Sequence, residues 1–331
     1  MRTLVGVAMA LAVALGGYVA FSPRTTLPLA ESRISVDTMN LNGIAWTAAG
    51  IVIAGELGNI LVSADEGAHW TPARMQLQRY AAITRLVFVD AKHGFAFGHE
   101  GMILRSSDGG LNWEEMSFDK EKGVPYMAAA RLPSGEWLAV GAFGRAARSH
   151  DDGRHWQAAT LTPEFEDLHY NGLASTADGN RWLLVGEAGT LLRSADGGKE
   201  WKKVAPFYNG SLYGAVHLGD KAWLAYGMRG HIFRSVDDGL TWSAVPMQGP
   251  VSLHAHHLFA DGRLLLLGQG GMVLESRDQG QSFQPLRRGA RETLTGMLVL
   301  PDGNWLLASS AGLRRQAPPG ASAPAAAKAG A

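Results

Sequence analysis

The chain has 331 residues, with 30 basic and 30 acidic side chains and no cysteine. Balanced charge argues against nucleic acid as the main ligand, because nucleic-acid-binding domains are usually basic. Without cysteine the chain has no disulfide, thiol nucleophile, thiolate metal site or lipoprotein anchor. The 42 glycines indicate many tight turns.

The N-terminus begins with an apolar segment. No charged residue occurs from Leu4 to Phe21, a run that is long for a signal-peptide core and short for a spanning helix. Residues 1–21 are therefore expected to be a signal peptide or an uncleaved membrane anchor, and the anchor is favoured because no clean cleavage site follows. Either reading predicts export, to the periplasmic face of an inner membrane. Residues 22–33 contain prolines and are expected to be a linker.

A repeated pattern dominates the rest of the sequence. Its form is G-x-x-G, four residues, then S-x-D-x-G-x-x-W, and copies begin at residues 55, 98, 141, 186, 227 and 268. Copies that recur every 41 to 45 residues indicate a propeller or solenoid. The last four fixed residues of the successive copies are Ser63, Asp65, Gly67, Trp70; Ser106, Asp108, Gly110, Trp113; Ser149, Asp151, Gly153, Trp156; Ser194, Asp196, Gly198, Trp201; Ser235, Asp237, Gly239, Trp242; and Ser276, Asp278, Gly280, Phe283.

The fixed residues of the repeat have the properties of a hairpin turn. The aspartate can accept backbone N–H bonds from residues just ahead. The glycine permits a positive φ, and the aromatic ring can be buried. The pattern resembles the Asp-box, or bacterial neuraminidase repeat, which lies between the third and outermost strands of propeller blades. This resemblance implies a structural role for the box residues.

Each repeat also contains two apolar segments that are typical of strands. The expected inner strands cover residues 41–46, 84–89, 126–132, 171–175, 213–218 and 253–259, and the second strands cover 51–54, 94–97, 137–140, 182–185, 223–226 and 264–267. A seventh copy at 294–300, 305–308 and 313–315 lacks the box and a fourth strand.

These segments predict an all-β fold, a seven-bladed β-propeller of four-stranded blades spanning residues 34–315. Ile34–Met39 alternates apolar and polar residues and is expected to complete the last blade, which would close the ring. Residues 316–331 are rich in alanine and proline and are expected to be disordered.

Several conspicuous side chains are expected to serve the fold. Nearly all of the ten tryptophans recur at repeat positions, so core packing explains them better than a carbohydrate platform. Basic residues precede four box serines, and a shared structural contact is the expected role of Arg105, Arg148, Arg193 and Arg234. The box turns lack the spaced oxygen ligands and final glutamate of a calcium loop.

Residues that depart from the repeat mark the candidate binding face. The inner strands carry Gly43, Gly172, Gly214 and Gly296 in one column, and the other blades are expected to place Arg85, Met127 and His254 there. The G-x-x-G turns and the links between blades add further variable residues on the same face. The predicted partner-binding residues are Arg85, His99, Glu100, Tyr126, Arg145, Tyr170, Arg229 and His254, and an acidic or polar partner segment is expected.

No metal, cofactor or catalytic residue is predicted. His254, His256 and His257 suggest zinc, but no third ligand or supporting carboxylate is evident. A glycoside hydrolase could still assemble a carboxylate pair from Glu56, Glu100, Glu187 or the loop with Glu164, Glu166 and Asp167. The sequence lacks the Arg-Ile-Pro motif of sialidases and the second propeller of tandem-propeller xyloglucanases.

Over about residues 31–315 the chain resembles the photosystem II stability/assembly factor family and its bacterial relatives. The resemblance rests on the G-x-x-G…R-S-x-D-G-G-x-x-W repeat and the export segment. It implies a non-catalytic scaffold that binds a membrane protein or complex through one propeller face. The expected client is a photosystem-like assembly or a transporter, and the propeller is expected to be monomeric. The alternatives are a glycan- or peptide-binding module and an Asp-box hydrolase.

Overall fold

The computed structural model describes residues 2–22, 35–121, 123–162, 167–247 and 249–319, and it divides into two compact units, Met1–Ile34 and Ser35–Ala331. The first unit contains one helix, α1 (Arg2–Phe21). By length and hydropathy, none of the described helices could cross a membrane. The predicted linker lies almost wholly outside the described residues, as does most of the predicted disordered tail.

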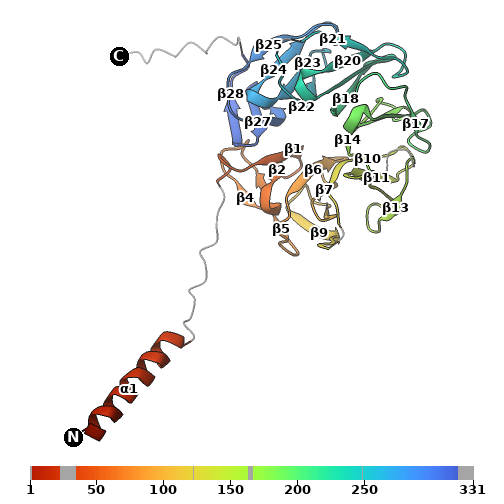
Figure 1. The fold of residues 1–331 in the computed structure, drawn as a ribbon. Coiled ribbons are helices and arrows are strands. Elements are labelled where there is room, and N and C mark those ends of the chain that lie inside the picture. Colours follow the sequence, from red (N-terminus) through yellow and green to blue (C-terminus); the bar gives the residue numbers. More distant parts are fainter. Residues whose placement is uncertain (1, 23–34, 122, 163–166, 248, 320–331) are drawn as a thin grey trace, which may run out of the picture. The chain divides into compact units, whose positions relative to one another are not determined.

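The described residues of the second unit form seven sheets arranged around a centre, which confirms the seven-bladed propeller (Figure 1). The four or three main strands of each sheet are antiparallel. The first four blades are β1 (Leu41–Thr47), β2 (Gly50–Gly55), β3 (Ile60–Ser63), β4 (Thr71–Pro72); β6 (Ile83–Phe88), β7 (Gly94–Gly98), β8 (Ile103–Ser106), β9 (Asn112–Ser117); β10 (Tyr126–Arg131), β11 (Trp137–Gly141), β12 (Ala146–Ser149), β13 (Gln157–Ala159); and β14 (Tyr170–Ser175), β15 (Trp182–Gly186), β16 (Leu191–Ser194), β17 (Lys202–Lys203). The last three are β18 (Leu212–Gly219), β19 (Ala222–Gly227), β20 (Ile232–Ser235), β21 (Ser243–Val245); β22 (Leu253–Leu258), β23 (Leu264–Gly268), β24 (Val273–Ser276), β25 (Gln284–Arg287); and β26 (Leu294–Val299), β27 (Trp305–Ser309), β28 (Gly312–Gln316). A short strand, β5 (Arg74–Met75), adds to the outer edge of blade 2, parallel to β9.

The core lies between neighbouring blades. The second strands are apolar on both faces, as in the buried run Trp182–Val185 of β15, because each blade packs against one neighbour on either side. The second strands bury three tryptophans fully in this way, Trp137, Trp223 and Trp305. The box residue Trp113 of the outer strand β9 is also fully buried between blades 1 and 2. Trp46, which has no counterpart in other blades, is 40% exposed.

The box turns are fixed by one hydrogen-bond pattern in all six copies. The serine hydroxyl donates to the aspartate Oδ1 over 2.7 to 3.0 Å and accepts the glycine N–H over 2.8 to 2.9 Å. The aspartate accepts further backbone N–H groups, as from His69 to Asp65. The box glycines have φ between 76° and 92°, and each box tryptophan donates its Nε1–H to the glycine carbonyl. Every polar group of the motif thus serves the turn.

The arginines before the box serines brace neighbouring blades. Arg105 donates to the carbonyl of Asp152 over 3.2 Å, and Arg234 donates to that of Gln279 over 2.8 Å. Arg193 contacts Asp238 in the same way, and Arg148 reaches the Gly198 carbonyl of the next box. These contacts give the four arginines the structural role expected from their repeat position.

The predicted closing strand is not formed. Ile34 lies outside the described residues, and residues 36–38 form a turn in which the Thr38 and Met39 N–H groups donate to Ser35. Two hydrogen bonds tie this turn to the last strand: the Leu313 N–H donates to the Val36 carbonyl, and the Arg314 guanidinium donates to the Asp37 carbonyl over 3.2 Å. Blade 7 therefore has three strands among the described residues. The segment turns over residues 36–38 and buries Met39 instead of extending along β28.

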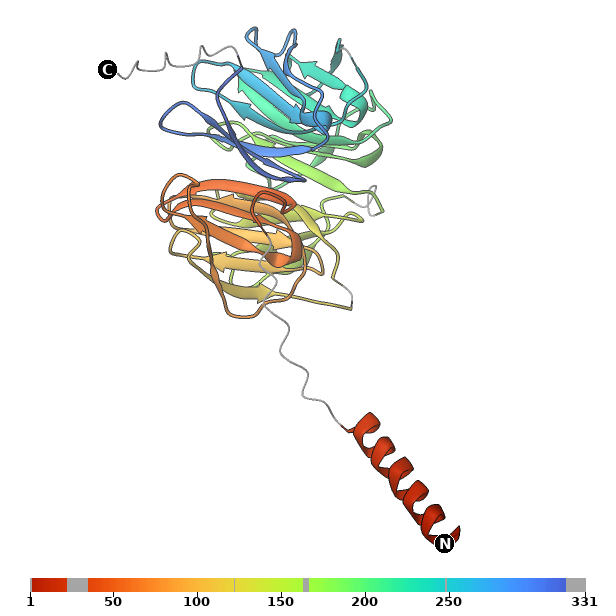
Figure 2. The same cartoon turned by 90° about the vertical axis from the view of Figure 1, so that its left-hand side faces the viewer.

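Blades 1 and 7 are joined at their inner strands. The Thr295 hydroxyl of β26 donates to the Leu41 carbonyl of β1 over 2.6 Å. Figure 2, turned by 90° from Figure 1, shows the orange sheet of blade 1 beside the blue sheet of blade 7. The ring thus closes at its centre, between residues from opposite ends of the propeller sequence.

Candidate functional site

The strand order separates two faces of the propeller. The G-x-x-G turns join second and third strands, so they lie on the face opposite the box turns. We call this the GxxG face and define it by residues 55–58, 98–101, 141–144, 186–189, 227–230 and 268–271. The links between blades reach the same face, as where Gln78 donates to the Leu57 carbonyl over 2.7 Å.

The last two positions of each G-x-x-G turn have a left-handed backbone, and the second of them is always glycine. The residues at the first of the two have φ between 50° and 68°: Leu57, Glu100, Phe143, Ala188, Arg229 and Gly270. Glycine adopts this conformation without steric cost, but only blade 6 has glycine there. The large side chains of Leu57 and Phe143 are 47% and 59% exposed, and Arg229 is also exposed.

The structure divides the predicted site residues into three groups. His99, Glu100 and Arg229 belong to the GxxG face, and Arg145 directly follows its third turn. Arg145 is committed to its own blade, since its Nε donates to the Tyr126 hydroxyl over 3.1 Å.

Tyr126 and Tyr170 are buried, 2% and 1% exposed, so their expected place on the rim is wrong. They begin β10 and β14, and the other inner strands begin with buried apolar residues: Leu41, Ile83, Leu212, Leu253 and Leu294. Their rings therefore fill a core position that recurs in every blade.

Arg85 and His254 form the third group and line a central cavity, although they do not occupy equivalent positions. Every inner strand has a bulge at its second residue: Asn42, Thr84, Met127, Asn171, Tyr213, His254 and Thr295. The column that follows the bulge is Gly43, Arg85, Ala128, Gly172, Gly214, Ala255 and Gly296. The prediction that Met127 and His254 share the glycine column was thus wrong by one residue. Arg85 is the single large side chain among small ones.

Four bulge residues link neighbouring blades around the centre. Asn42 donates to the Ile83 carbonyl over 2.8 Å, and Asn171 donates to that of Leu212 over 2.9 Å. Thr84 donates likewise to Tyr126, and Thr295 to Leu41. The side chains at the other three positions, Met127, Tyr213 and His254, differ in kind. The Tyr213 and His254 rings stack on each other, with centroids 4.8 Å apart and an interplanar angle of 17°.

The cavity at the centre has a volume of about 240 Å³ and is lined by the inner strands. Tyr226 reaches it from the second strand of blade 5, because a β-carbon at Gly214 would lie 2.3 Å from the Tyr226 hydroxyl oxygen. That oxygen lies 2.7 Å from Nδ1 of His256. Burial raises the pKa of Tyr226, and burial together with the Arg85 charge lowers the pKa of His256 to about 4.

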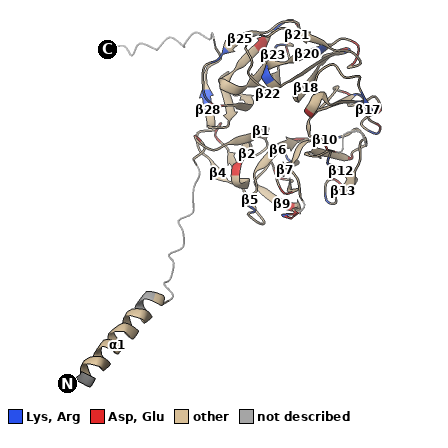
Figure 3. Cartoon of the chain, in the orientation of Figure 1, with Lys and Arg blue, Asp and Glu red and all other residues tan. Residues whose placement is uncertain are grey.

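Arg85, Tyr226 and His256 form what we call the channel cluster. Arg85 interacts electrostatically with both partners, and its enclosure by the ring of strands lowers its pKa although its side chain remains accessible within the channel. Inner strands otherwise carry almost no charge. Arg85 and Arg131 are their only Lys, Arg, Asp or Glu residues, and Figure 3 shows the strands around the centre mostly in tan.

Aromatic and charged groups connect the channel to the GxxG face at blades 4 to 6. The Tyr208 hydroxyl lies 3.2 Å from Nδ1 of His231. Burial raises the pKa of Tyr208, the nearby Tyr213 raises it further, and Arg229 opposes this effect. Burial and the Glu187 charge raise the pKa of Tyr213. Tyr208 thus interacts electrostatically both with Arg229 and with Tyr213 of the Tyr213–His254 stack.

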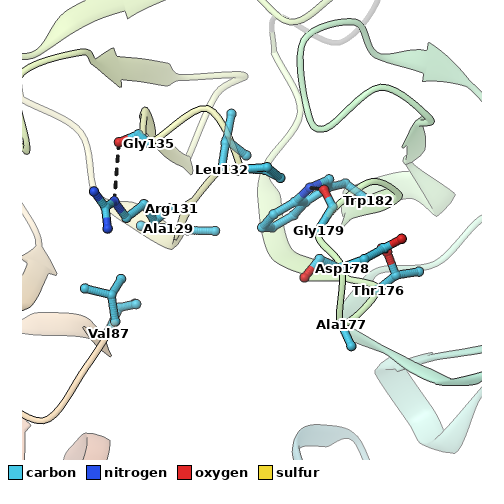
Figure 4. A pocket seen from close by; sticks show the side chains of 14 residues that line it. Val87, Ala129, Arg131, Leu132, Gly135, Thr176, Ala177, Asp178, Gly179 and Trp182 are labelled. Carbon is cyan, nitrogen blue, oxygen red and sulfur yellow. Dashed lines mark hydrogen bonds between the residues drawn. The ribbon is translucent and has the colours of Figure 1, made fainter.

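A second hollow lies at the opposite ends of the inner strands of blades 2 to 4. Its volume is about 580 Å³, and Val87, Ala129, Leu132 and Trp182 give it apolar walls (Figure 4). Arg131 is its cation, and the Arg131 Nε–H donates to the Gly135 carbonyl over 3.4 Å. This hollow belongs to the opposite side of the propeller from the predicted binding residues.

The three neighbouring histidines, His254, His256 and His257, all lie in β22. Among the described residues, no three His, Asp or Glu side chains gather as metal ligands would. Of the carboxylates considered for hydrolysis, Glu164 and Glu166 lie outside the described residues. Glu56, Glu100 and Glu187 lie in the G-x-x-G turns of three different blades, blades 1, 2 and 4.

Sequence reasoning missed Tyr226, His256 and Tyr213 as cavity residues. A signal for Tyr226 was present. The residues paired with the small-residue column are Ala54, Phe97, Val140, Val185, Tyr226, Leu267 and Ala308. Tyr226 is the one hydroxyl in this apolar set, and it lies opposite a glycine.

Comparisons with known proteins agree with this architecture. The sequence profile of a family described as photosynthesis system II assembly factor YCF48 matches residues 9–107, 74–165 and 106–323. No curated protein matches the sequence.

Solved propellers superpose on most of the chain. "YCF48 bound to D1 peptide" is 18% identical with a TM-score of 0.67, covering 90% of this chain and 99% of that one. YCF48 from Cyanidioschyzon merolae is 15% identical with a TM-score of 0.66, covering 86% and 98%. A GH74 xyloglucanase from Xanthomonas campestris is 15% identical with a TM-score of 0.65, covering 85% of this chain and 52% of its own. At these identities the likeness shows the fold alone.

Proposed function

Because this chain belongs to the family of the photosystem II assembly factor YCF48, we propose that it is a non-catalytic scaffold that binds a segment of a membrane protein through its GxxG face. One solved structure of a YCF48 protein carries a D1 peptide. Peptide capture is therefore a use to which a propeller of this family is suited. The client of this chain is to be found by experiment.

The observation that carries the proposal is the left-handed position of the G-x-x-G turns. A residue with a β-carbon costs roughly 1–2 kcal/mol there relative to glycine. Blades 1, 3 and 5 nevertheless place Leu57, Phe143 and Arg229 at this position, all exposed. Backbone strain that presents side chains to solvent supports a binding surface.

The surroundings of these side chains suit a peptide with apolar and acidic residues. Tyr80, in the link between blades 1 and 2, is 69% exposed and also has a positive φ of 59°. Arg229, Arg288 and Arg291 add exposed cations on turns and links. Aromatic and arginine side chains are enriched among residues that dominate binding energies.

Export is the second part of the proposal. The apolar N-terminal segment would deliver the propeller to the periplasmic side of an inner membrane, where a membrane client is accessible. Fractionation of the native host and mass spectrometry of the mature N-terminus test this. Recovery of the full chain in the cytoplasm would contradict it.

Site-specific crosslinking tests the binding face. A photoreactive amino acid replaces Phe143 on the GxxG face or, as the control, Arg154 in the third box turn. We expect position 143 to capture one membrane protein and position 154 to capture none. Capture from position 154 alone would assign binding to the other face, and no capture from either would contradict the scaffold proposal.

A further inference from the structure

The channel contains a cation that has no protein counterion. Arg85 forms no hydrogen bond or ion pair with any residue that the structure describes. The 18 residues that line the central cavity include no aspartate or glutamate. The other arginine of the inner strands, Arg131, at least donates to a carbonyl. Arg85 is therefore the exception among charged residues near the propeller axis.

The Arg85 side chain is accessible within the channel, so a ligand that enters the cavity can reach its guanidinium. The surrounding strands lower the pKa of Arg85, because burial disfavours the charged form. An anion beside Arg85 would supply the interaction that the chain does not.

Neutral donors surround the same space. Tyr226 and His256 share one hydrogen bond of 2.7 Å, and a neutral imidazole has one N–H donor. If the hydroxyl donates to Nδ1, Nε2–H of His256 remains available, and if Nδ1–H donates, the hydroxyl hydrogen remains. Either arrangement leaves the pair one donor. His254 also lines the cavity, and its buried Nε2 has no partner among the described residues.

We propose that the central channel is a binding site for a small carboxylate, with Arg85 as its ion-pair partner and the Tyr226–His256 pair as a second donor. The planar guanidinium matches a carboxylate in a two-bond geometry. One fixed cation beside neutral histidines balances a monoanion, which favours a carboxylate over a phosphate dianion. The cavity of about 240 Å³ is smaller than most drug-sized sites and so limits the ligand to a small molecule or a single side chain.

This inference is independent of the proposed scaffold function, since it requires neither a client protein nor a membrane. Calorimetric titration of the purified propeller-containing chain in chloride buffer at constant ionic strength tests it. The probes are acetate, benzoate and inorganic phosphate, with benzamide as the uncharged match for benzoate. We expect benzoate or acetate to bind and benzamide not to bind.

Three variants assign the site. Arg85→Met should weaken carboxylate binding about tenfold or more, and Tyr226→Phe should weaken it severalfold. Arg154→Met, which changes an exposed arginine of a box turn, should leave it unchanged. Arg85→Met should also melt no lower than the unchanged protein when no carboxylate is added, because it removes an unpaired cation.

A peptide arm distinguishes the source of the carboxylate. A short peptide with one glutamate is compared with its glutamine version. Arg85-dependent binding of the glutamate peptide without binding of the free acids would keep the site and assign a protein-borne carboxylate. Any one of four results would overturn the proposal. These are no binding of any carboxylate, equal carboxylate binding by Arg85→Met, tighter binding of phosphate than of carboxylate, and a large loss of stability in Arg85→Met.

Discussion

The Tyr226 hydroxyl occupies the space that a β-carbon on Gly214 would enter. The two residues are paired across β18 and β19, and the added carbon would lie 2.3 Å from the hydroxyl oxygen. Gly214 has no left-handed backbone that would itself demand glycine. The glycine is therefore explained by its neighbour's side chain, and the pair brings a hydroxyl from a buried strand to the channel.

Gly214→Ala should displace Tyr226 and break its hydrogen bond to His256. We expect a loss of about 1–3 kcal/mol in the free energy of unfolding, as is typical for overpacking, measured by denaturant titration. In a Tyr226→Leu background the same change should cost less, because the obstructing hydroxyl is gone.

Gly296→Ala is the matched control, since it lies in the same column and its new carbon would meet only a methyl group of Ile44 at 3.0 Å. A cost for Gly296→Ala equal to that for Gly214→Ala would show that the column, and not Tyr226, requires glycine.

Thr295 offers a test of how the ring closes. Its hydroxyl bond to Leu41 joins blades that no short link connects, whereas the equivalent Thr84 bond joins blades 2 and 3, which are consecutive in sequence. Thr295→Val should reduce the hydrogen-exchange protection of β26 to β28 by local opening of blade 7. Thr84→Val should affect only global stability.

The two threonine variants should each lose about 0.5–1.5 kcal/mol overall, the usual net value of one hydrogen bond. If exchange in β26 to β28 is the same in both variants, the inner-strand contact is not what holds the ring closed.

The fold was largely predictable from the sequence, and the site was not. The box pattern recurs in six of the seven blades, so the second strands and their burial follow from local residue types. The register of the inner strands does not. Each contains a bulged residue, and in blades 3 and 6 no glycine marks the column after it, so Met127 and His254 were placed one residue out of line. The prediction of a closing strand was wrong for a related reason. Alternation of apolar and polar residues over 34–39 cannot reveal that residues 36–38 form a turn.

The channel cluster depends on contacts between blades. Arg85, Tyr226 and His256 come from blades 2, 5 and 6, and only the closed ring brings them together. Arg85 could be singled out because it interrupts a column of small residues. Tyr226 could have been singled out in the same way, as a hydroxyl in an apolar column. The proximity of Arg85 and Tyr226 could not be predicted, since no sequence pattern relates residues of non-adjacent blades.

The lowered pKa values of the box aspartates make the fold sensitive to acid. Burial raises the pKa of Asp237, but hydrogen bonds from Thr241 and Ser235 outweigh it and lower this pKa to about 2. For Asp278, hydrogen bonds from Ser282 and Ser276 outweigh burial and lower the pKa to about 2. A carboxylate whose pKa is lower in the folded state stabilises the folded protein at pH values above its unfolded-state pKa, which is near 4. This stabilisation is lost as the pH falls through the folded-state pKa. The propeller should therefore lose stability progressively from about pH 5 to pH 2.

Asp237→Asn isolates one such group. We expect it to be less stable than the unchanged protein at pH 7 and to show a smaller fall in melting temperature between pH 5 and pH 3. An unaltered pH dependence would mean that the carboxylate is not preferentially stabilised in the folded state.

Asp238, the residue after Asp237, should contribute far more to the stability of the fold than exposed aspartates do. Its Oδ1 accepts from Trp223 over 3.2 Å and lies 3.1 Å from Arg181, and its Oδ2 contacts Arg193 of the preceding blade. The side chain is nearly buried, with the residue 8% exposed. Removing one member of a buried ionic network typically costs 3–5 kcal/mol, because the remaining charges lose their partner. Asp238→Ala should therefore lose about 3–5 kcal/mol in the free energy of unfolding, measured with denaturant.

Asp220→Ala, on an exposed turn, is the control and should change stability by less than about 0.5 kcal/mol. Similar small losses for both variants would mean that the arginine braces between blades contribute little to holding the propeller together.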